Sequence, residues 1–235
     1  MSTRAPSIQS LRMCEALLSA TGWRRRRTFS AASVITAQRD GPQLHVPRLV
    51  WVWIGGSFAE YYVAPARILF KLPDGVSFEE GALFEPAGVA MHAVEQAHIV
   101  PGDTVVVFGV GPIGLVAIQM LNVCGASHVV AVDIDDYRLG LAENYGAIPL
   151  NPTKLDVAAE VKKLTSRRHG ADVVVEMTGS PRVYPSMFEL LRKEGRIVIV
   201  GHAGEVPINV TEGITLKGAS IKGSYGRGVW ELGPT

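Results

Sequence analysis

The chain has 235 residues, of which 47% are hydrophobic and 19% are charged, and its formal net charge is +1. This balance excludes a disordered chain and leaves enough apolar material for a folded core. The two cysteines, Cys14 and Cys124, are too few for a disulfide scaffold or for a zinc site built from four cysteines.

The first 50 residues differ from the rest in charge. They hold eight arginines against two acidic residues, a balance of +6, and the remaining residues balance to −5. Residues 1–39 are rich in Arg and Ser, which is typical of a transit peptide and gives the mitochondrial matrix as an alternative location. Because Arg24–Arg27 form one block instead of being spread around a helix, we favour an unstructured or mistranslated leader and a cytoplasmic protein.

Charge and hydropathy also argue against two classes of partner. A single run of four arginines, with no basic face elsewhere, is weak support for nucleic-acid binding. Residues 104–132 contain no Asp, Glu, Lys or Arg, and such a stretch is long enough to span a membrane. However, the glycines and the proline at 109–114 divide it, so it predicts a strand, a turn and a helix.

From residue 55 the sequence predicts regular elements. Residues 59–63 are typical of a strand, and a second extended piece ends at Pro73. Ser77 and Glu80 have the spacing of a capping box, which predicts the start of a helix. The dipeptide Glu85-Pro86 predicts the start of a second helix, which runs to about Gln96.

A regular alternation of strands and helices follows. Apolar, mostly β-branched runs predict strands at 104–108, 128–132, 148–150, 172–175, 196–200 and 220–222. Helical patterns occupy 112–123, 136–144, 155–166 and 182–191, and Cys124 is expected in the core beside the first of them. Strands alternating with such helices predict right-handed crossovers and an α/β, doubly wound parallel sheet of the Rossmann type.

The strongest chemical signal is the motif Gly109-Val110-Gly111-Pro112-Ile113-Gly114, which follows a strand and opens a helix. Gly109 permits the tight turn, Gly111 lets a pyrophosphate approach the backbone, and Gly114 lets helix and strand pack closely. The helix N-terminus offers unpaired N–H groups to the phosphates. A glycine turn without a ligand is the alternative, but an acidic residue at the end of the next strand disfavours it.

That acidic residue, Asp133, predicts which dinucleotide is bound. Its carboxylate can accept hydrogen bonds from both hydroxyls of the adenosine ribose and would repel a 2′-phosphate, so NAD is favoured over NADP. Arg138 lies one helical turn further on. It either packs against the adenine or ribose or is a solvated surface arginine, and the sequence leaves both interpretations open.

Residues 55–231 resemble the medium-chain, zinc-dependent alcohol dehydrogenase family, and within it the threonine dehydrogenase branch. The matching stretches are Phe84-Glu85-Pro86 with Gly88 and His92, the glycine motif, Asp133 with Tyr137-Arg138-Leu139, and residues 217–227 (KGASIKGSYGR). Polyol dehydrogenases of the sorbitol type share the Glu-Pro motif and are the nearest rival. The resemblance implies zinc-assisted, NAD-dependent oxidation of a small secondary alcohol, with L-threonine as the first candidate, and a role in amino-acid catabolism.

The resemblance also implies roles for single residues. Glu85 matches an acidic residue beside the catalytic zinc that acts as a ligand or in proton relay. Without the resemblance, a carboxylate placed by the helix dipole is the simpler interpretation. The residues that match cofactor contacts are Ile113, Asp133 and Arg138 and, on the nicotinamide side, Val200, Gly201, His202, Ser224 and Tyr225.

The sequence departs from the family pattern on the zinc side. It contains no His-Glu dipeptide, Cys14 stands in unrelated sequence, and the four-cysteine lobe expected just before residue 55 is absent. We expect residues 1–54 to be foreign, 55–75 to be a remnant of a GroES-like β catalytic domain, 76–227 to be the NAD-binding domain and 228–235 to be a truncated tail. A catalytically inactive NAD-binding fragment and a module that pairs copies of the chain, as relatives often do, remain as alternative functions.

Overall fold

The computed structural model describes residues 72–165 and 169–226. The chain divides into two units, with the boundary between Glu85 and Pro86, and the second unit ends at Gly228. The predicted strand at 59–63, the segment 1–54 with Cys14, and the tail at 228–235 lie outside the described residues. The domain limits expected from the sequence therefore stay a prediction.

In the first unit, the short helix α4 (Phe78–Ala82) begins with the expected capping box. The Ser77 hydroxyl accepts a hydrogen bond from the Glu80 amide at 3.1 Å, and the Glu80 carboxylate accepts one from the Ser77 amide at 2.7 Å. The hydrogen bonds that the Glu80 carboxylate accepts from the Ser77 amide and the Ser77 hydroxyl hold its pKa below its usual range. Helix α5 (Phe84–Ala97) follows, begins one residue before the predicted start, and belongs to the second unit from Pro86 onward.

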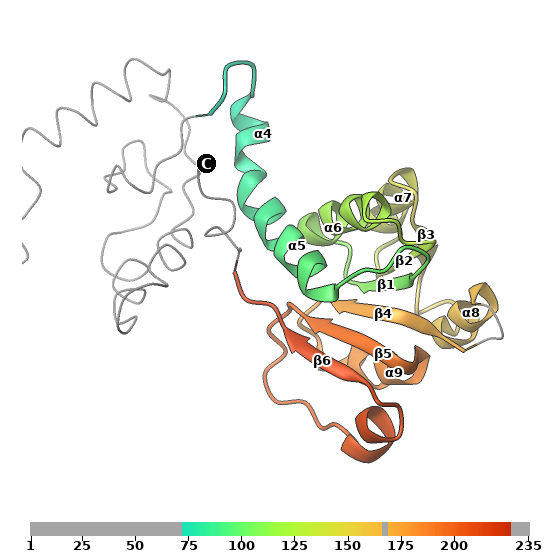
Figure 1. The fold of residues 1–235 in the computed structure, drawn as a ribbon. Coiled ribbons are helices and arrows are strands. Elements are labelled where there is room, and N and C mark those ends of the chain that lie inside the picture. The colour runs from blue at the N-terminus through green and yellow to red at the C-terminus, as the bar shows by residue number, and fades with distance from the viewer. Residues whose placement is uncertain (1–71, 166–168, 227–235) are drawn as a thin grey trace, which may run out of the picture. The chain divides into compact units, whose positions relative to one another are not determined.

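The second unit contains a fully parallel sheet in the order β3-β2-β1-β4-β5-β6 (Figure 1). Its strands are β1 (Thr104–Phe108), β2 (His128–Val132), β3 (Ile148–Leu150), β4 (Ala171–Glu176), β5 (Leu191–Ile199) and β6 (Ser220–Gly223). The connecting helices are α6 (Pro112–Val123), α7 (Asp136–Asn144), α8 (Val157–Leu164), η3 (Pro181–Val183), α9 (Tyr184–Leu190) and η4 (Thr211–Thr215). The strand order reverses between β1 and β4, so the predicted doubly wound Rossmann fold is confirmed.

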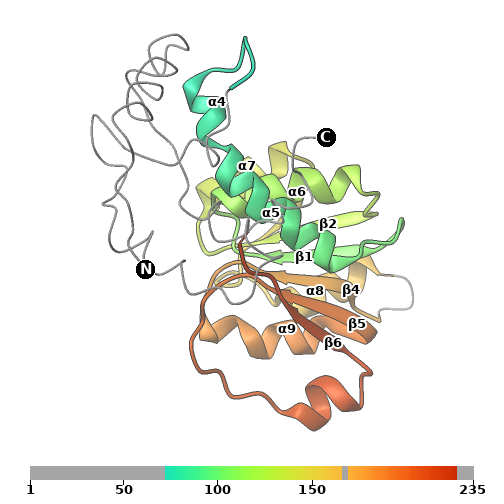
Figure 2. The ribbon, with the colours of Figure 1, turned by 60° about the vertical axis from the view of Figure 1, so that its left-hand side comes forward.

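Helices cover both faces of this sheet (Figure 2). One apolar cluster joins α5, α6 and α7 to alternate strand residues such as Val105 and Val175. The other joins α8 and α9 to the intervening strand residues, such as Val106 and Val174. All five residues of β1 are buried, as expected of a strand covered on both sides.

The uncharged stretch at 104–132 forms β1, α6 and β2, as predicted. Among the described residues, no helix combines the length and the apolar character that a bilayer crossing requires. The expectation for Cys124 is wrong. Helix α6 ends at Val123, and Cys124, which follows as the C-cap residue, is exposed.

The largest departures from the predicted boundaries concern three elements, α8, α9 and β5. Helix α8 starts at Val157 because the Asp156 carboxylate accepts a hydrogen bond from the Ala159 amide at 3.0 Å. The helix expected at 182–191 is a short 3₁₀ turn followed by α9, and β5 begins immediately at Leu191 instead of at residue 196. Strand β5 is longer because Leu191 pairs with Ala171 before a shift of register.

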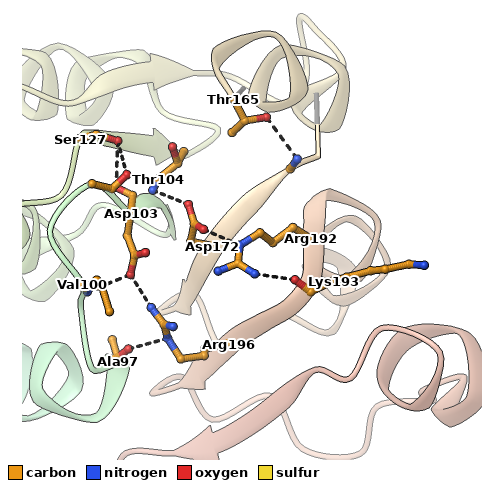
Figure 3. Close-up of polar contacts among 12 residues, drawn as sticks. Ala97, Val100, Asp103, Thr104, Ser127, Thr165, Asp172, Arg192, Lys193 and Arg196 are labelled. Atoms are coloured by element: carbon orange, nitrogen blue, oxygen red, sulfur yellow. Dashed lines mark hydrogen bonds and ion pairs between the residues drawn. The ribbon is translucent and has the colours of Figure 1, made fainter. Parts of the chain in front are cut away.

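A cluster of polar side chains joins the strands at their amino ends (Figure 3). It consists of the side chains of Asp103, Asp172, Arg192 and Arg196, together with the backbone amide of Thr104. The Arg196 guanidinium donates to the Asp103 carboxylate and, through Nε, to the Ala97 carbonyl at 3.0 Å. The Asp172 carboxylate accepts from the Thr104 amide at 2.8 Å and from the Arg192 guanidinium. These bonds tie the starts of β1, β4 and β5 to one another and to the end of α5.

Candidate functional site

The turn after β1 requires glycine at its first position. Gly109 has φ +88°, a left-handed conformation that residues with a Cβ rarely adopt. A Cβ there would also lie 2.8 Å from the Thr178 methyl carbon and 2.9 Å from the Thr178 amide nitrogen. The chain therefore turns sharply at Gly109, in contact with the segment that follows β4.

The other two glycines of the motif differ in what surrounds them. A Cβ on Gly114 would lie 2.2 Å from the Gly109 carbonyl oxygen, so only glycine lets α6 pack this closely on the turn. A Cβ on Gly111 would meet no protein atom within 4 Å. Gly111 is the N-cap of α6 and makes no side-chain capping bond. The helix N-terminus thus faces open space that a ligand carrying phosphate groups would fit.

Asp133 connects this turn to the end of β2. Its carboxylate is buried, with the residue 8% exposed. Oδ2 accepts a hydrogen bond from the Val110 amide at 3.0 Å, and Oδ1 accepts one from the Asp135 amide at 3.0 Å. Each oxygen retains acceptor capacity for a further donor such as a hydroxyl.

Arg138 lies beside two carboxylates. One terminal nitrogen, Nη1, is 3.8 Å from Asp133 Oδ2, and Nε is 3.7 Å from Asp135 Oδ2. The side chain is about half exposed, at 51%. The structure thus places Arg138 at the edge of the candidate site, next to Asp133. A contact between Arg138 and a ligand stays a prediction.

A neighbouring loop supports the segment that carries Asp133. Asn151, directly after β3, donates from its amide group to the Ile134 carbonyl at 3.2 Å and to the Asp136 carboxylate at 2.8 Å. Lys154 also pairs with Asp136, at 2.6 Å. The Lys154 and Asn151 bonds hold the pKa of Asp136 below its usual range.

The segments after β5 and β6 also lie at the carboxyl edge. Val200 and Gly201 both donate their amides to the Glu176 carbonyl, at 2.9 and 3.1 Å, and the Ser224 amide donates to the Ile199 carbonyl at 2.8 Å. The rings of His202 and Tyr225 have centroids 6.3 Å apart. The residues expected on the nicotinamide side therefore come together, but what they bind is not tested by these contacts.

Sequence reasoning missed the residues at the end of β4. Glu176 is a fully buried carboxylate that accepts hydrogen bonds from Thr178 and Gly179. The signal was present in the sequence, because Glu176 is the acidic residue that closes the otherwise apolar run Val173–Val175. An acidic residue there, at the carboxyl end of a strand next to the switch point, is expected near a ligand.

The zinc side of the prediction finds no counterpart in the described residues. Glu85 lies in the first turn of α5, on the first unit's side of the boundary, so its role stays a prediction. Across residues 72–165 and 169–226, no group of three or more His, Cys, Asp or Glu side chains could hold a metal ion. The described part of the chain alone does not fit a zinc site.

Comparison with known proteins gives consistent matches. Residues 112–232 match the family described as zinc-binding dehydrogenase. L-threonine 3-dehydrogenase of Anaeromyxobacter sp. (strain Fw109-5) is 39% identical over 178 residues, covering 75% of this chain and 51% of the relative. The probable D-xylulose reductase A of Aspergillus fumigatus is 38% identical over 184 residues, with the same shares covered.

Solved structures lead to the same group of proteins. 2R,3R-butanediol dehydrogenase from Bacillus subtilis superimposes with a TM-score of 0.68 at 38% identity, covering 76% of this chain and 52% of that one. L-idonate 5-dehydrogenase from Escherichia coli gives a TM-score of 0.60 at 30% identity, covering 66% and 44%. The chain spans about half the length of the curated relatives it matches.

Proposed function

The chain belongs to the zinc-binding dehydrogenase family, and on that premise we propose that it binds NAD as part of an enzyme that oxidises a secondary alcohol. The observation that carries the proposal is a hydrogen bond between Asp133 and the turn after β1 (residues 109–114, the glycine turn). Asp133 Oδ2 lies 3.0 Å from the Val110 amide nitrogen. This contact sets the carboxylate that we propose for ribose binding next to a helix N-terminus that has open space before it.

Each part of the candidate site has a distinct task in this proposal. The N-terminus of α6, open at Gly111, receives the pyrophosphate, with Ile113 in the first turn beside it. Asp133 accepts hydrogen bonds from the adenosine ribose, and Arg138 covers the adenine or ribose edge. The segments that flank the nicotinamide are Val200–His202 and Ser224-Tyr225. NAD, when bound, supplies the acceptor for the hydride, and the protein supplies position and electrostatic environment.

The family description implies a zinc ion as well as NAD. The described residues by themselves do not fit a zinc site. Glu85 remains our candidate for a position near the metal, as a ligand or in proton relay. Its test is whether Glu85→Gln abolishes turnover while leaving NADH affinity unchanged.

L-threonine is the substrate we propose first, with a polyol of the sorbitol type as the alternative. Relatives named for threonine and for D-xylulose match this chain about equally well, at 39% and 38% identity. We propose a cytoplasmic enzyme of amino-acid catabolism that assembles with copies of itself. The competing proposal is an NAD-binding fragment. It would bind NAD at the same site but would not oxidise an alcohol.

An NADH fluorescence titration of the purified chain tests the binding proposal. Gly111→Ala should fold as well as the wild type, because its Cβ meets no protein atom, yet it should bind NADH at least tenfold more weakly, since the Cβ occupies the space proposed for the pyrophosphate. Gly140→Ala in α7 is the matched control, because its Cβ also meets no atom within 4 Å. Equal NADH affinity in the two variants would contradict the proposed site.

Turnover separates the enzyme from the inactive fragment. NADH production from NAD is followed with L-threonine, with D-sorbitol and with 2R,3R-butanediol, in the presence of added zinc. Production with one alcohol only, abolished by a chelator, supports the dehydrogenase and selects its substrate class. Saturable NADH binding without production from any alcohol supports the fragment.

A further inference from the structure

Glu176 is a buried carboxylate at the switch point of the sheet. It is 0% exposed and ends β4. In register it stands opposite Phe108 of β1 on one side and Ile199 of β5 on the other. It therefore lies between the strand that leads into the glycine turn and the strand that leads into Val200–His202.

One oxygen of this carboxylate organises the turn that follows β4. Oε1 accepts a hydrogen bond from the Thr178 amide at 2.7 Å and one from the Gly179 amide at 2.9 Å. It also accepts one from the Thr178 hydroxyl, which in turn accepts from the Ser180 amide. Residues 177–180 thus take their shape from a single side chain.

The turn at 177–180 separates the two halves of the proposed NAD site. On one side, Thr178 is so near that a Cβ on Gly109 would lie 2.8 Å from its methyl carbon. On the other side, a Cβ on Gly179 would lie 3.1 Å from the His202 amide nitrogen. A displacement of this turn would therefore shift the glycine turn relative to residues 200–202, the segment proposed to flank the nicotinamide.

The second oxygen of Glu176 has a different environment. Oε2 is buried and has no hydrogen-bond partner among the described residues. A Cβ on Gly201 would lie 2.6 Å from it, so this oxygen packs directly against the backbone of Gly201. A buried acceptor without a partner is destabilising. The one side chain therefore fixes the turn at 177–180 through Oε1 and packs against Gly201 through Oε2.

We propose that Glu176 is a positioning residue, which sets the nicotinamide half of the NAD site against the adenosine half. The inference rests on the proposed function. Glu176 does not touch the cofactor, because its carboxylate is fully buried, and acts through Thr178 and Gly179. Losing it should therefore weaken binding of the whole dinucleotide, while a ligand that occupies only the adenosine half should bind as before.

The test compares two ligands by isothermal titration calorimetry on the full chain: NADH, and ADP, which lacks the nicotinamide half. Glu176→Met keeps the volume and removes both acceptors, whereas Glu176→Gln keeps one oxygen for Thr178 and Gly179. Glu176→Met should bind NADH about tenfold more weakly and ADP within about twofold of the wild type, and Glu176→Gln should recover NADH affinity to within about threefold.

Three results would overturn the inference. They are unchanged NADH affinity in Glu176→Met, equal losses for NADH and ADP, and a Gln variant as weak as the Met variant. A folded wild-type chain that binds neither ligand would instead contradict the proposed function, and the inference with it. That result needs no variant, so the two failures are distinguishable.

A second pair of variants decides the matter if Glu176→Met does not fold. Thr178→Val removes the hydroxyl that joins Glu176 to Ser180 with little change in volume, and Thr178→Ser keeps that hydroxyl. Thr178→Val should bind NADH about threefold more weakly than Thr178→Ser at equal ADP affinity. Equal NADH affinities in this pair would overturn the inference.

Discussion

The amino and carboxyl edges of the parallel sheet use their polar side chains in different ways. At the amino edge, Asp103, Asp172, Arg192 and Arg196 are bonded to one another or to the backbone of neighbouring elements (Figure 3). At the carboxyl edge, Asp133 keeps spare acceptor capacity. The buried side-chain atoms without a partner among the described residues, Glu176 Oε2 and Ser224 Oγ, belong to this edge as well.

Under the proposed function, this difference assigns stability to the amino edge and ligand binding to the carboxyl edge. A polar cluster closed on itself holds strands together and offers nothing to a ligand. A group of acceptors and amides that is only partly satisfied costs stability, and a ligand can satisfy it. We therefore expect substitutions at the amino edge to change the free energy of unfolding and those at the carboxyl edge to change affinity for NADH.

The largest effect is expected for Asp133→Ala. The variant removes the carboxylate proposed to accept from both ribose hydroxyls, and two hydrogen bonds to a charged group are together equivalent to about a hundredfold in affinity. NADH affinity should fall by about that factor, and the preference for NADH over NADPH should narrow because the repelling charge is gone. Fluorescence titrations with both nucleotides measure the two effects. Unaltered selectivity would contradict the role of Asp133.

The matching change at the amino edge is Arg196→Met. It leaves the nearly buried Asp103 carboxylate without its cation and the Ala97 carbonyl without its donor. The variant should lose about 2 kcal/mol of unfolding free energy in urea, while its NADH affinity should stay within about twofold of the wild type. Arg182→Met, at an exposed position in η3, is the control. A loss of NADH affinity in a folded Arg196→Met variant would contradict the proposed difference between the two edges.

The sequence predicts the glycine turn and Asp133 at the carboxyl edge, but it does not predict the roles of Arg196 and Glu176. The reason is physical. The glycine spacing and Asp133 predicted the turn because backbone conformation and helix entry are local properties. The roles of Arg196 and Glu176 depend on register. Arg196 contacts Asp103 across 93 positions of the chain, and Glu176 organises the site only because β4 lies between β1 and β5. The same dependence on pairing explains why the start of β5 was misplaced, since Leu191 pairs with Ala171.

Asn151→Ala sharpens the comparison within the carboxyl edge. The variant removes the amide that holds the Ile134 carbonyl and the Asp136 carboxylate, and the segment carrying Asp133 should lose its fixed position. NADH and ADP affinities should both fall about tenfold, because the disturbance lies in the adenosine half. Asn209→Ala, which removes a bond to the Glu212 amide elsewhere in the fold, is the control. A loss of NADH affinity without a loss of ADP affinity would contradict this expectation. It would indicate that Asn151 acts on the nicotinamide half, as proposed for Glu176.

The smallest effect is expected for Asp136→Asn, and it should appear only as a dependence on pH. Bonds from Lys154 and Asn151 lower the pKa of Asp136 in the folded chain below its ordinary value of 3.8. The carboxylate therefore contributes stability that is fully present above pH 3.8 and is lost as the pH falls through the lower, folded-state pKa. Thermal unfolding midpoints of wild type and variant should differ by a constant amount from neutral pH to about 4 and converge below it. In a Lys154→Met background the difference should shrink, because the main partner is gone. A difference that persists in strong acid would mean that Asp136 acts through its shape and not through its charge.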